Sequence, residues 1–246
     1  MSYLQRLNTF IQEKLSTRVN DRIAKLEEIL NSMALDYTSL DAARIFNGQT
    51  VRRAIVDRII STFPFDVCVE TGTFLGFTTS YLARHFPRVY SVELNPLYSN
   101  VARKNLQVFA NVEIINDDSV AALKALLPEI GDRSCFVYLD AHWEDHLPLA
   151  EELELLSAVE HAIIVIDDFQ NKADSGYSYD NYGKGKALDY ATFSPVFRKL
   201  KYAVFEPNVA AVSETGYKRG YVICTTHQQS GDTLQRFPQL ARVAVA

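Results

Sequence analysis

Val67-Cys-Val-Glu-Thr-Gly-Thr-Phe-Leu-Gly-Phe-Thr-Thr79 is the stretch of the chain that says most about its architecture. An apolar run ends there in Glu70, and a turn with two glycines leads into a helical pattern. A second apolar run, Val89-Tyr-Ser-Val-Glu93, ends in another acid twenty-three positions after Glu70. The first pattern predicts a turn whose backbone can approach a ligand, and Glu93 stands where a carboxylate accepts from ribose hydroxyls. Together they predict a nucleoside-binding unit.

Further apolar runs alternate with helical patterns along the chain. The predicted strands are 66–70, 89–93, 112–115, 135–140 and 162–168, and the predicted helices between them are 78–85, 97–109, 119–127 and 149–159. Strands that are apolar throughout are typical of a parallel sheet covered by helices on both faces. Two later runs, 202–206 and 220–226, flank a polar segment and predict an antiparallel pair. We therefore expect an α/β, Rossmann-like three-layer sandwich with a mostly parallel seven-stranded sheet.

The ends of the chain differ from its middle. Apolar residues three and four apart in 18–30 and 51–60 predict a helical extension over residues 1–60. The main domain is expected over 61–230, with a loosely attached tail over 231–246, and all three form one globular domain. The apolar stripe within 18–30 favours packing onto the domain, and a homodimer through it stays open.

Composition narrows the class of protein. The net charge of −5 disfavours a nucleic-acid partner, and no apolar run approaches the ~20 residues that span a bilayer. The N-terminal sequence lacks the apolar core of a signal peptide, so we expect a cytoplasmic protein. Cys68, Cys135 and Cys224 lie in or beside apolar runs and are expected to be buried, reduced thiols.

The motif Glu70-Thr-Gly-Thr-Phe-Leu-Gly76 resembles the first motif, acid-x-Gly-x-x-x-Gly, of the class I S-adenosylmethionine-dependent methyltransferases. This resemblance implies S-adenosylmethionine as the cofactor, with Gly72 beside its amino-acid end and Glu93 on the ribose. Residues 117–119 would then contact the adenine. The implied cofactor contacts are Glu70, Thr71, Gly72, Thr73, Phe74, Gly76, Glu93, Leu94, Asp117, Asp118, Ser119, Asp140 and Trp143.

Carboxylates also end the fourth and fifth predicted strands. Asp140 ends the fourth, and Asp167 and Asp168 end the fifth. Ligands in open α/β sheets lie outside the carboxyl ends of the strands, and neighbouring strands are about 4.8 Å apart. Three converging carboxylates would repel one another, and a divalent cation with a preference for oxygen ligands would offset that repulsion. Without a metal, these acids would cap a helix or a loop.

The same residues resemble motifs of the catechol O-methyltransferase type and of metal-dependent natural-product O-methyltransferases. Leu139-Asp-Ala-His-Trp143 is similar to the Leu-Asp-His-Trp of that type, and Asp167-Asp168 to its Asp-Asn. The resemblance implies that Asp140, Asp167 and Asp168 hold the metal, expected to be Mg²⁺, with Asp140 also serving catalysis. Ala141 is an insertion, and Asp168 replaces the Asn.

His142 is the best candidate for a general base. Its unperturbed pKa of about 6.5 suits proton abstraction. A histidine that is hydrogen-bonded to a carboxylate, or that joins the metal shell, is the alternative. His146 is a weaker candidate for the base, and Trp143 is expected to pack against the cofactor or the substrate.

The segment 170–186 reads as a loop rich in Gly and Tyr that follows the predicted metal ligands. We expect a lid over an aromatic, sugar or polyketide-like substrate, and a plain surface loop is the alternative.

The sequence therefore predicts an S-adenosylmethionine-dependent methyltransferase that uses a divalent metal to methylate a hydroxyl of a small molecule. An NAD(P)-dependent oxidoreductase is one alternative, although Phe74 stands where Gly-x-Gly-x-x-Gly needs its second glycine. A noncatalytic nucleoside-binding module with a protein partner is another.

Overall fold

The computed structural model of the chain describes Arg22, Lys25 and residues 44–143 and 146–245. The contacts divide the chain into a unit of residues 1–40 and a unit of residues 41–246. Arg22 and Lys25 lie in a helix, and the remainder of the helix and apolar stripe predicted within 18–30 falls outside the described residues.

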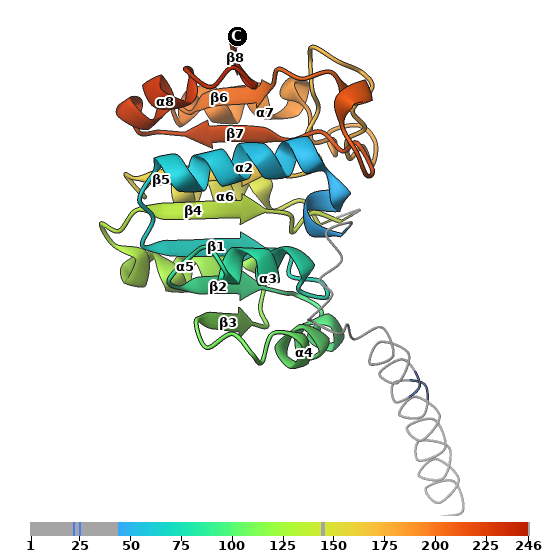
Figure 1. Cartoon of the computed structure of the whole chain (residues 1–246), viewed down its shortest axis with the longest axis vertical. Coiled ribbons are helices and arrows are strands. Elements are labelled where there is room, and N and C mark those ends of the chain that lie inside the picture. The colour runs from blue at the N-terminus through green and yellow to red at the C-terminus, as the bar shows by residue number, and fades with distance from the viewer. Residues whose placement is uncertain (1–21, 23–24, 26–43, 144–145, 246) are drawn as a thin grey trace, which may run out of the picture. The chain divides into compact units, whose positions relative to one another are not determined.

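The second unit is built on one eight-stranded sheet with the order β3-β2-β1-β4-β5-β7-β6-β8 (Figure 1). The strands are β1 (Val67–Thr71), β2 (Val89–Val92), β3 (Val112–Ile115), β4 (Cys135–Leu139), β5 (Ala162–Ile166), β6 (Ala203–Pro207), β7 (Val222–Thr225) and β8 (Leu240–Val243). The first five strands pair in parallel, and β7 joins β5 in antiparallel orientation. The Rossmann-like α/β fold and the antiparallel β6–β7 pair that the sequence predicts are confirmed.

The C-terminal segment is an integral part of this sheet. Strand β8 pairs antiparallel with β6 over four residue pairs, from Val204↔Val243 to Pro207↔Leu240. Leu240 and the preceding Leu234 are both buried in the core. The expected loose tail over 231–246 is therefore wrong, and the sheet has eight strands where seven were predicted. The four residues of β8 are too short a run, with too little alternation, to signal a strand by themselves.

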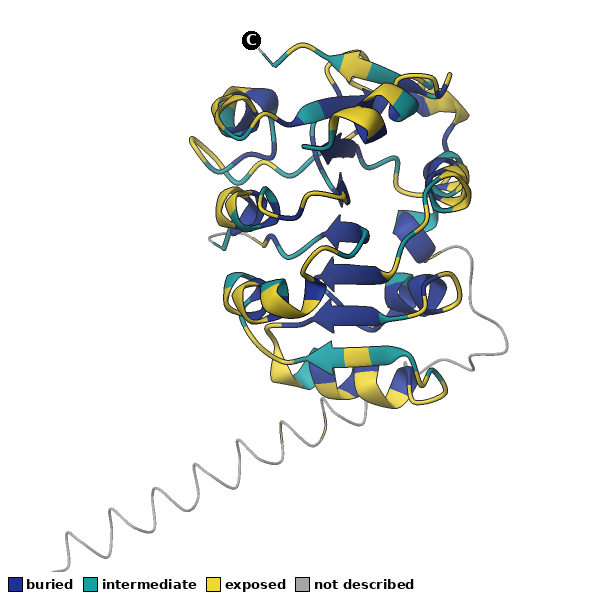
Figure 2. Ribbon diagram, turned by 90° about the vertical axis from the view of Figure 1, so that its left-hand side faces the viewer, coloured by how far each residue is buried: buried dark blue, intermediate teal, exposed yellow. Residues whose placement is uncertain are grey.

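Helices cover both faces of the sheet, as a parallel sheet requires (Figures 1 and 2). Figure 1 shows α2, α3 and α8 on the near face and α5, α6 and α7 on the far face, with α4 beside β3. Their bounds are α2 (Thr50–Thr62), α3 (Phe77–Ala83), α4 (Pro96–Asn105), α5 (Ser119–Ile130), α6 (Leu149–Leu156), α7 (Tyr190–Lys199) and α8 (Gln228–Leu234). Strands β1, β4 and β5 are buried along their whole length (Figure 2).

The core has one half on each side of the sheet, because successive strand side chains point to opposite faces. In β1, Val67 and Val69 pack into the cluster that contains Leu153 of α6, whereas Cys68 packs into the cluster that contains Ile55 of α2. Cys68, Cys135 and Cys224 are all buried and free, as expected.

The start of α2 is docked at the carboxyl edge of the sheet. Glu214, in the connection between β6 and β7, accepts hydrogen bonds from the backbone N–H groups of Val51 (2.9 Å) and Arg52 (3.0 Å). Those two groups belong to the first turn of the helix, where N–H groups lack a partner inside the helix. A 3-10 turn, η2 (Ile45–Gly48), precedes α2. This capping brings Asn47 and Arg52 to the site described below.

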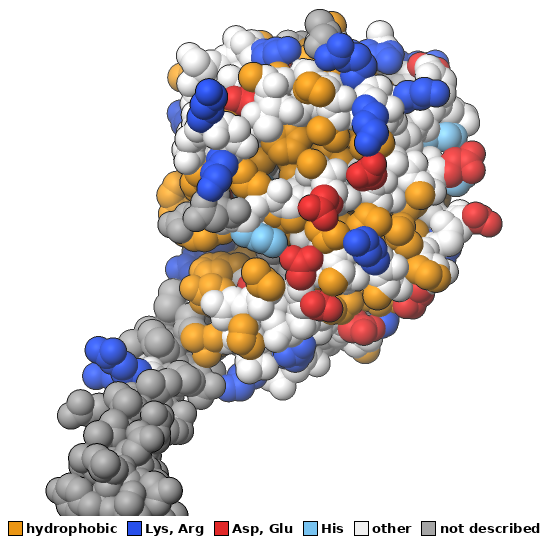
Figure 3. Space-filling view, turned by 180° about the vertical axis from the view of Figure 1, so that it is seen from behind, with side chains coloured by type: hydrophobic (Ala, Val, Ile, Leu, Met, Phe, Trp, Pro, Cys, Tyr) orange, Lys and Arg blue, Asp and Glu red, His pale blue; other side chains and the backbone are white. Residues whose placement is uncertain are grey.

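The face covered by α5, α6 and α7 carries acidic side chains over its middle and a group of Lys and Arg side chains at the end near β8 (Figure 3). Along α6, Glu151 and Glu154 are exposed, but Glu152 is buried. Among the described helices, none combines the length and the apolar character that crossing a membrane requires.

Candidate active site

The carboxyl ends of the parallel strands bring the predicted site residues to one edge of the sheet. The hydrogen-bond ladder continues beyond the strands: the Asp140 N–H donates to the carbonyl of Thr71 (2.9 Å) and the Asp167 N–H donates to that of Leu139 (3.0 Å). The Gly72 N–H likewise donates to the carbonyl of Val92 (2.9 Å). The residues that follow β1, β4 and β5 therefore lie side by side.

Gly72 marks the closest approach between two of these strand ends. Its φ is +88°, and a Cβ built on it would lie 2.2 Å from the carbonyl oxygen of Asp140. Only glycine fits this position, because any side chain would collide with backbone atoms. The turn that the sequence predicts after β1 is thus held directly against the end of β4.

Glu70 stabilises the turn after β1 through hydrogen bonds to α3 and β2. It is buried, and its Oε2 accepts hydrogen bonds from the hydroxyls of Thr79 (2.5 Å) and Ser91 (2.5 Å). Burial raises the pKa of the Glu70 carboxyl to about 7, although the two hydroxyls favour its charged form. Glu70 thereby links α3 to β2, which suits its predicted part in fixing the loop.

Glu93 joins the glycine turn to the end of β2. Its Oε2 accepts from the N–H of Phe74 (2.7 Å) and its Oε1 accepts from the N–H of Asn95 (2.8 Å). Burial raises the pKa of this carboxyl. Each carboxylate oxygen can accept a further hydrogen bond, so Glu93 can still take two ribose hydroxyls. The exposed side chains of Phe74 and Leu94 flank it.

Residues 117–119, between β3 and α5, have different roles. Asp118 is the N-cap of α5, accepting from the N–H groups of Val120 (3.0 Å) and Ala121 (3.1 Å). Its other oxygen lies 3.4 Å from Nε2 of His146. Ser119 is buried, whereas Asp117 is exposed and uses only Oδ1, to accept from the N–H of Asp118. Asp117 is thus the carboxylate of this trio with the most capacity left for an adenine amine.

Trp143 is 73% exposed, and its backbone pairs with that of His146 in a short bridge. Its packing against a ligand stays a prediction.

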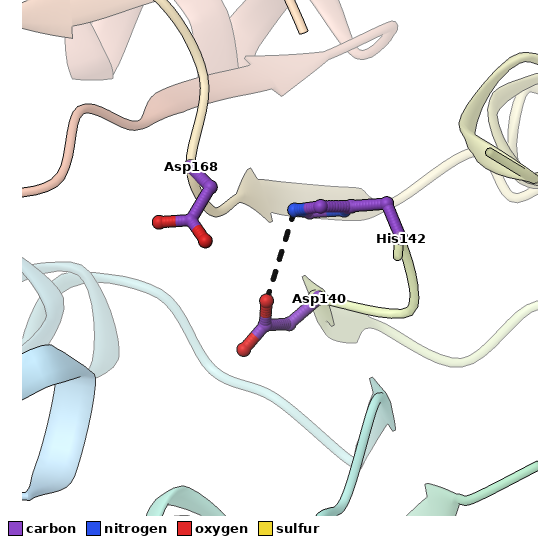
Figure 4. Close-up of side chains that lie close together, drawn as sticks. All are labelled: Asp140, His142 and Asp168. Atoms are coloured by element: carbon purple, nitrogen blue, oxygen red, sulfur yellow. Dashed lines mark ion pairs between the residues drawn. The ribbon is translucent and has the colours of Figure 1, made fainter. Parts of the chain in front are cut away.

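Asp140, His142 and Asp168 converge at this edge (Figure 4). One ligand atom from each lies within 4.8 Å of the others, and Nε2 of His142 is 3.8 Å from Oδ1 of Asp140. This nitrogen is buried and has no hydrogen-bond partner among the described residues. An unpartnered imidazole nitrogen and nearby carboxylate oxygens can together serve as ligands of a divalent cation.

Burial lowers the pKa of His142 to about 4, so that the imidazole is neutral near pH 7. The neutral form can ligate a metal, but a pKa that low makes His142 a weak general base. Burial together with the nearby carboxylates of Asp167 and Asp168 raises the pKa of Asp140 well above its ordinary value. Both shifts fit a pocket that needs a cation.

Asp167 is engaged elsewhere. Its carboxylate forms a buried ion pair with Arg52 and accepts hydrogen bonds from the Tyr138 hydroxyl (2.6 Å) and the Asn47 amide (3.2 Å). Although burial disfavours its charge, Arg52 and these donors hold the pKa of Asp167 below its ordinary value. The structure thus groups Asp140 and Asp168, two of the three predicted metal ligands, with His142 in place of Asp167.

Two residues of the site carry no signal in the sequence. Arg219 donates from Nε to Oδ1 of Asp168 (2.5 Å) and from Nη2 to Oδ1 of Asp180. Oδ2 of Asp180 lies 3.9 Å from Nε2 of His142. These residues come from polar, turn-like segments far apart in the sequence, so no spacing rule could have paired them.

The predicted lid segment 170–186 is held to the site at Asp180, whose N–H donates to the carbonyl of Asp168 (2.9 Å). Backbone bonds of Ser178 with Lys218 (3.0 Å) and Gly220 (2.7 Å) tie it to the start of β7. Tyr177 is buried, with its hydroxyl bonded to the carbonyl of Val209, and so supports the loop from within.

A cavity of about 110 Å³ lies at this edge of the sheet. Its lining comprises Arg44, Asn47, Gly72, Thr73, Phe74, Phe77, Thr78, Asp140 and Asp167. The cavity therefore joins the glycine turn to the carboxylates at the ends of β4 and β5.

The buried carboxyl of Glu152, on α6, should make the stability of the folded protein depend on pH. It is 1% exposed, its Oε1 lacks a hydrogen-bond partner in the described structure, and burial raises its pKa from 4.5 to about 7. The folded state thus holds this proton more tightly than the unfolded state, so stability is full below pH 4.5 and falls as pH rises through 7. Glu152→Gln should raise Tm by on the order of 5 °C at pH 8 and leave it nearly unchanged at pH 4.

Thermal unfolding between pH 4 and 8 measures this effect, with the exposed neighbour variant Glu151→Gln as control. Equal Tm values for Glu152→Gln and wild type at pH 8 would contradict it.

No family model matches the chain. In sequence it is 24% identical over 143 residues to catechol O-methyltransferase B of Danio rerio, an alignment that covers 55% of this chain and 54% of that protein. The chain thus spans about half the length of this relative.

Solved structures share the fold. An O-methyltransferase from Bacillus cereus, in complex with SAH, superposes with a TM-score of 0.53 at 15% identity over 80% of this chain and 89% of that one. The carbon methyltransferase CurJ gives a TM-score of 0.54 at 13% identity over 75% of this chain and 54% of that one. The chain therefore shares the fold of these two methyltransferases, and about half of it is similar in sequence to a catechol O-methyltransferase.

Proposed function

We propose that the protein methylates a hydroxyl oxygen of a small molecule, with S-adenosylmethionine as methyl donor and a divalent cation in the group formed by Asp140, His142 and Asp168. The observation that carries the proposal is the unpartnered, buried Nε2 of His142 among carboxylates, beside the glycine turn. The relative's name, a catechol O-methyltransferase, supports a hydroxyl acceptor.

The cofactor would lie across the glycine turn. Gly72 and Thr73 line the cavity beside Asp140, where the amino-acid end and the sulfonium would reach the carboxylates. Glu93 would accept from the ribose hydroxyls while it holds the N–H of Phe74. Asp117 would accept from the adenine amine, and the exposed rings of Phe74 and Trp143 would cover the cofactor.

The residues fit a cation because two partly buried carboxylates converge with a buried, neutral imidazole. A divalent cation bound there would lower the pKa of the acceptor hydroxyl. Carboxylates favour Mg²⁺ and Mn²⁺, and the imidazole makes Mn²⁺ a useful probe beside Mg²⁺. The protein's own part is to hold acceptor oxygen and methyl donor in line, which contributes up to about 7–11 kcal/mol in well-oriented reactions.

Calorimetric titration tests the cofactor. S-adenosylmethionine should bind with micromolar affinity, and a separate Mg²⁺ or Mn²⁺ titration should give heat that Asp168→Asn abolishes. NAD(H) binding without S-adenosylmethionine binding would instead select an oxidoreductase.

Glu93→Gln should weaken S-adenosylmethionine binding by roughly 10–100-fold, because hydrogen bonds to a charged group are each worth about 1.5–3 kcal/mol. The control is Glu113→Gln on β3, an exposed acid whose side chain pairs with Arg88. An affinity unchanged in Glu93→Gln would remove Glu93 from the ribose site.

A further inference from the structure

Arg219 stands between the cation group and the loop 170–186. Its guanidinium pairs with Asp168 at one end and with Asp180 at the other. Both carboxylates are largely buried, with 17% and 15% of their side chains exposed. A second guanidinium beside these carboxylates, that of Arg52, forms an ion pair with Asp167. Arg219 is therefore the positive charge that balances Asp168 and Asp180.

The arrangement around His142 extends the cation group by one carboxylate. Nε2 of His142 is 3.8 Å from Oδ1 of Asp140 and 3.9 Å from Oδ2 of Asp180. Asp180 therefore lies near the unpartnered nitrogen of His142 in the group that Figure 4 shows. Asp180 comes from the loop 170–186, whereas Asp140 follows β4. Arg219 pairs with Oδ1 of Asp168 and Oδ1 of Asp180, whereas Oδ2 of Asp180, the oxygen that faces His142, accepts from the Tyr182 hydroxyl. Arg219 thus balances the charge of both carboxylates and leaves the oxygen nearest His142 to a neutral donor.

We propose that Arg219 is a built-in competitor of the divalent cation: the guanidinium neutralises Asp168 and Asp180 when no cation is bound, and cation entry displaces it and adds Asp180 to the ligands. This inference rests on the proposed function in its use of a divalent cation at Asp140, His142 and Asp168.

The backbone of Arg219 is fixed, so that only its side chain needs to move. Its N–H donates to Oε1 of Gln49 (2.7 Å), and its carbonyl accepts from Nε2 of Gln49 (3.0 Å) and from Nη2 of Arg52 (2.6 Å). The side chain itself is 22% exposed, so the guanidinium can turn to water without unfolding the chain that carries it.

Asp180 would remain in place during this exchange. Its N–H donates to the carbonyl of Asp168 and its carbonyl accepts from the N–H of Leu188, at 2.9 Å each. The loop is therefore anchored by its backbone, and the exchange of partners involves side chains alone. The occupancy of the cation group and the charge contacts of the loop would change together.

Mn²⁺ titration calorimetry on the full chain tests the competition. Arg219→Gln should bind Mn²⁺ about 10-fold tighter than wild type or better, because the competing charge is gone. Arg219→Lys keeps the charge but loses the fork that engages two carboxylates, and should fall between them. Arg88→Gln makes the same change of net charge at the exposed pair with Glu113 and should match wild type.

An Mn²⁺ affinity in Arg219→Gln that equals or falls below that of wild type would overturn the inference, as would the absence of Mn²⁺ binding in every variant. Thermal unfolding checks that Arg219→Gln is folded, and Arg219→Lys carries the test if it is not. S-adenosylmethionine titrated into the same samples separates the outcomes: cofactor binding without competition rejects this inference alone, whereas no cofactor binding rejects the proposed function.

Discussion

Asp140→Asn should lower kcat/KM for methyl transfer by about 10³-fold or more, because a metal that activates an acceptor can contribute several kcal/mol and this variant would remove one carboxylate from the proposed cation group. The asparagine keeps the shape of the side chain and the backbone carbonyl that faces Gly72. S-adenosylmethionine affinity should therefore fall much less than the rate, although Asp140 is also among the predicted cofactor contacts. Initial rates with the best acceptor from a panel of hydroxyl compounds measure the effect.

Asp132→Asn is the control for Asp140→Asn, since Asp132 is an exposed residue in the turn after α5. It should keep the wild-type rate. A wild-type rate in Asp140→Asn, or equal losses of rate and of cofactor affinity, would contradict the metal role of Asp140.

Arg52→Met should lower the free energy of unfolding by about 3–5 kcal/mol, the range for breaking a buried ion pair on one side. Arg52 is fully buried, and its loss would leave the buried carboxylate of Asp167 without the guanidinium that pairs with it. It would also remove the hydrogen bonds to Gln49 and to the carbonyl of Arg219. Urea unfolding at pH 7 measures the change.

The next residue provides a control for Arg52→Met. Arg53→Met should cost less than about 1 kcal/mol, because Arg53 is partly exposed and makes no ion pair in the described structure. The double variant Arg52→Met with Asp167→Asn should recover part of the loss, since no charge is then left unpaired. A loss in Arg52→Met as small as that in Arg53→Met would mean that Asp167 does not depend on Arg52.

The parallel half of the sheet is readable in the sequence because its strands are buried on both faces and form clear apolar runs. β4 and β5 are examples: every residue of both is buried. β8 could not be read in this way. Only one of its four residues is buried, and its place in the sheet depends on pairing with β6.

The sequence predicts those residues of the candidate site that lie at the ends of strands. Asp140 follows β4 directly, Asp168 is the second residue after β5, and the turn at Gly72 follows β1. The sequence could not separate Asp167 from Asp168, because neighbouring residues at a strand end point to opposite faces. Asp167 faces Tyr138 and Arg52, whereas Asp168 has a φ of +52° and faces Arg219.

The sequence could not predict the ion pairs that involve Arg52, Asp180 and Arg219. Arg52 meets Asp167 across 115 positions of the chain, and Arg219 meets Asp168 across 51 and Asp180 across 39. Such pairs follow from how the segments around the sheet edge are docked, for example by Glu214 at the start of α2. Composition and periodicity do not specify that docking.

An assay of methyl transfer with and without a divalent cation tests the proposed function. The full chain would be incubated with S-adenosylmethionine labelled in its methyl group and with a panel of phenols, catechols and sugar hydroxyls, once with Mg²⁺ or Mn²⁺ and once with EDTA. Label is expected on an acceptor oxygen in the presence of the metal, with loss of transfer in EDTA and in Asp140→Asn. Transfer that proceeds equally in EDTA, or a cofactor that does not bind at all, would contradict it.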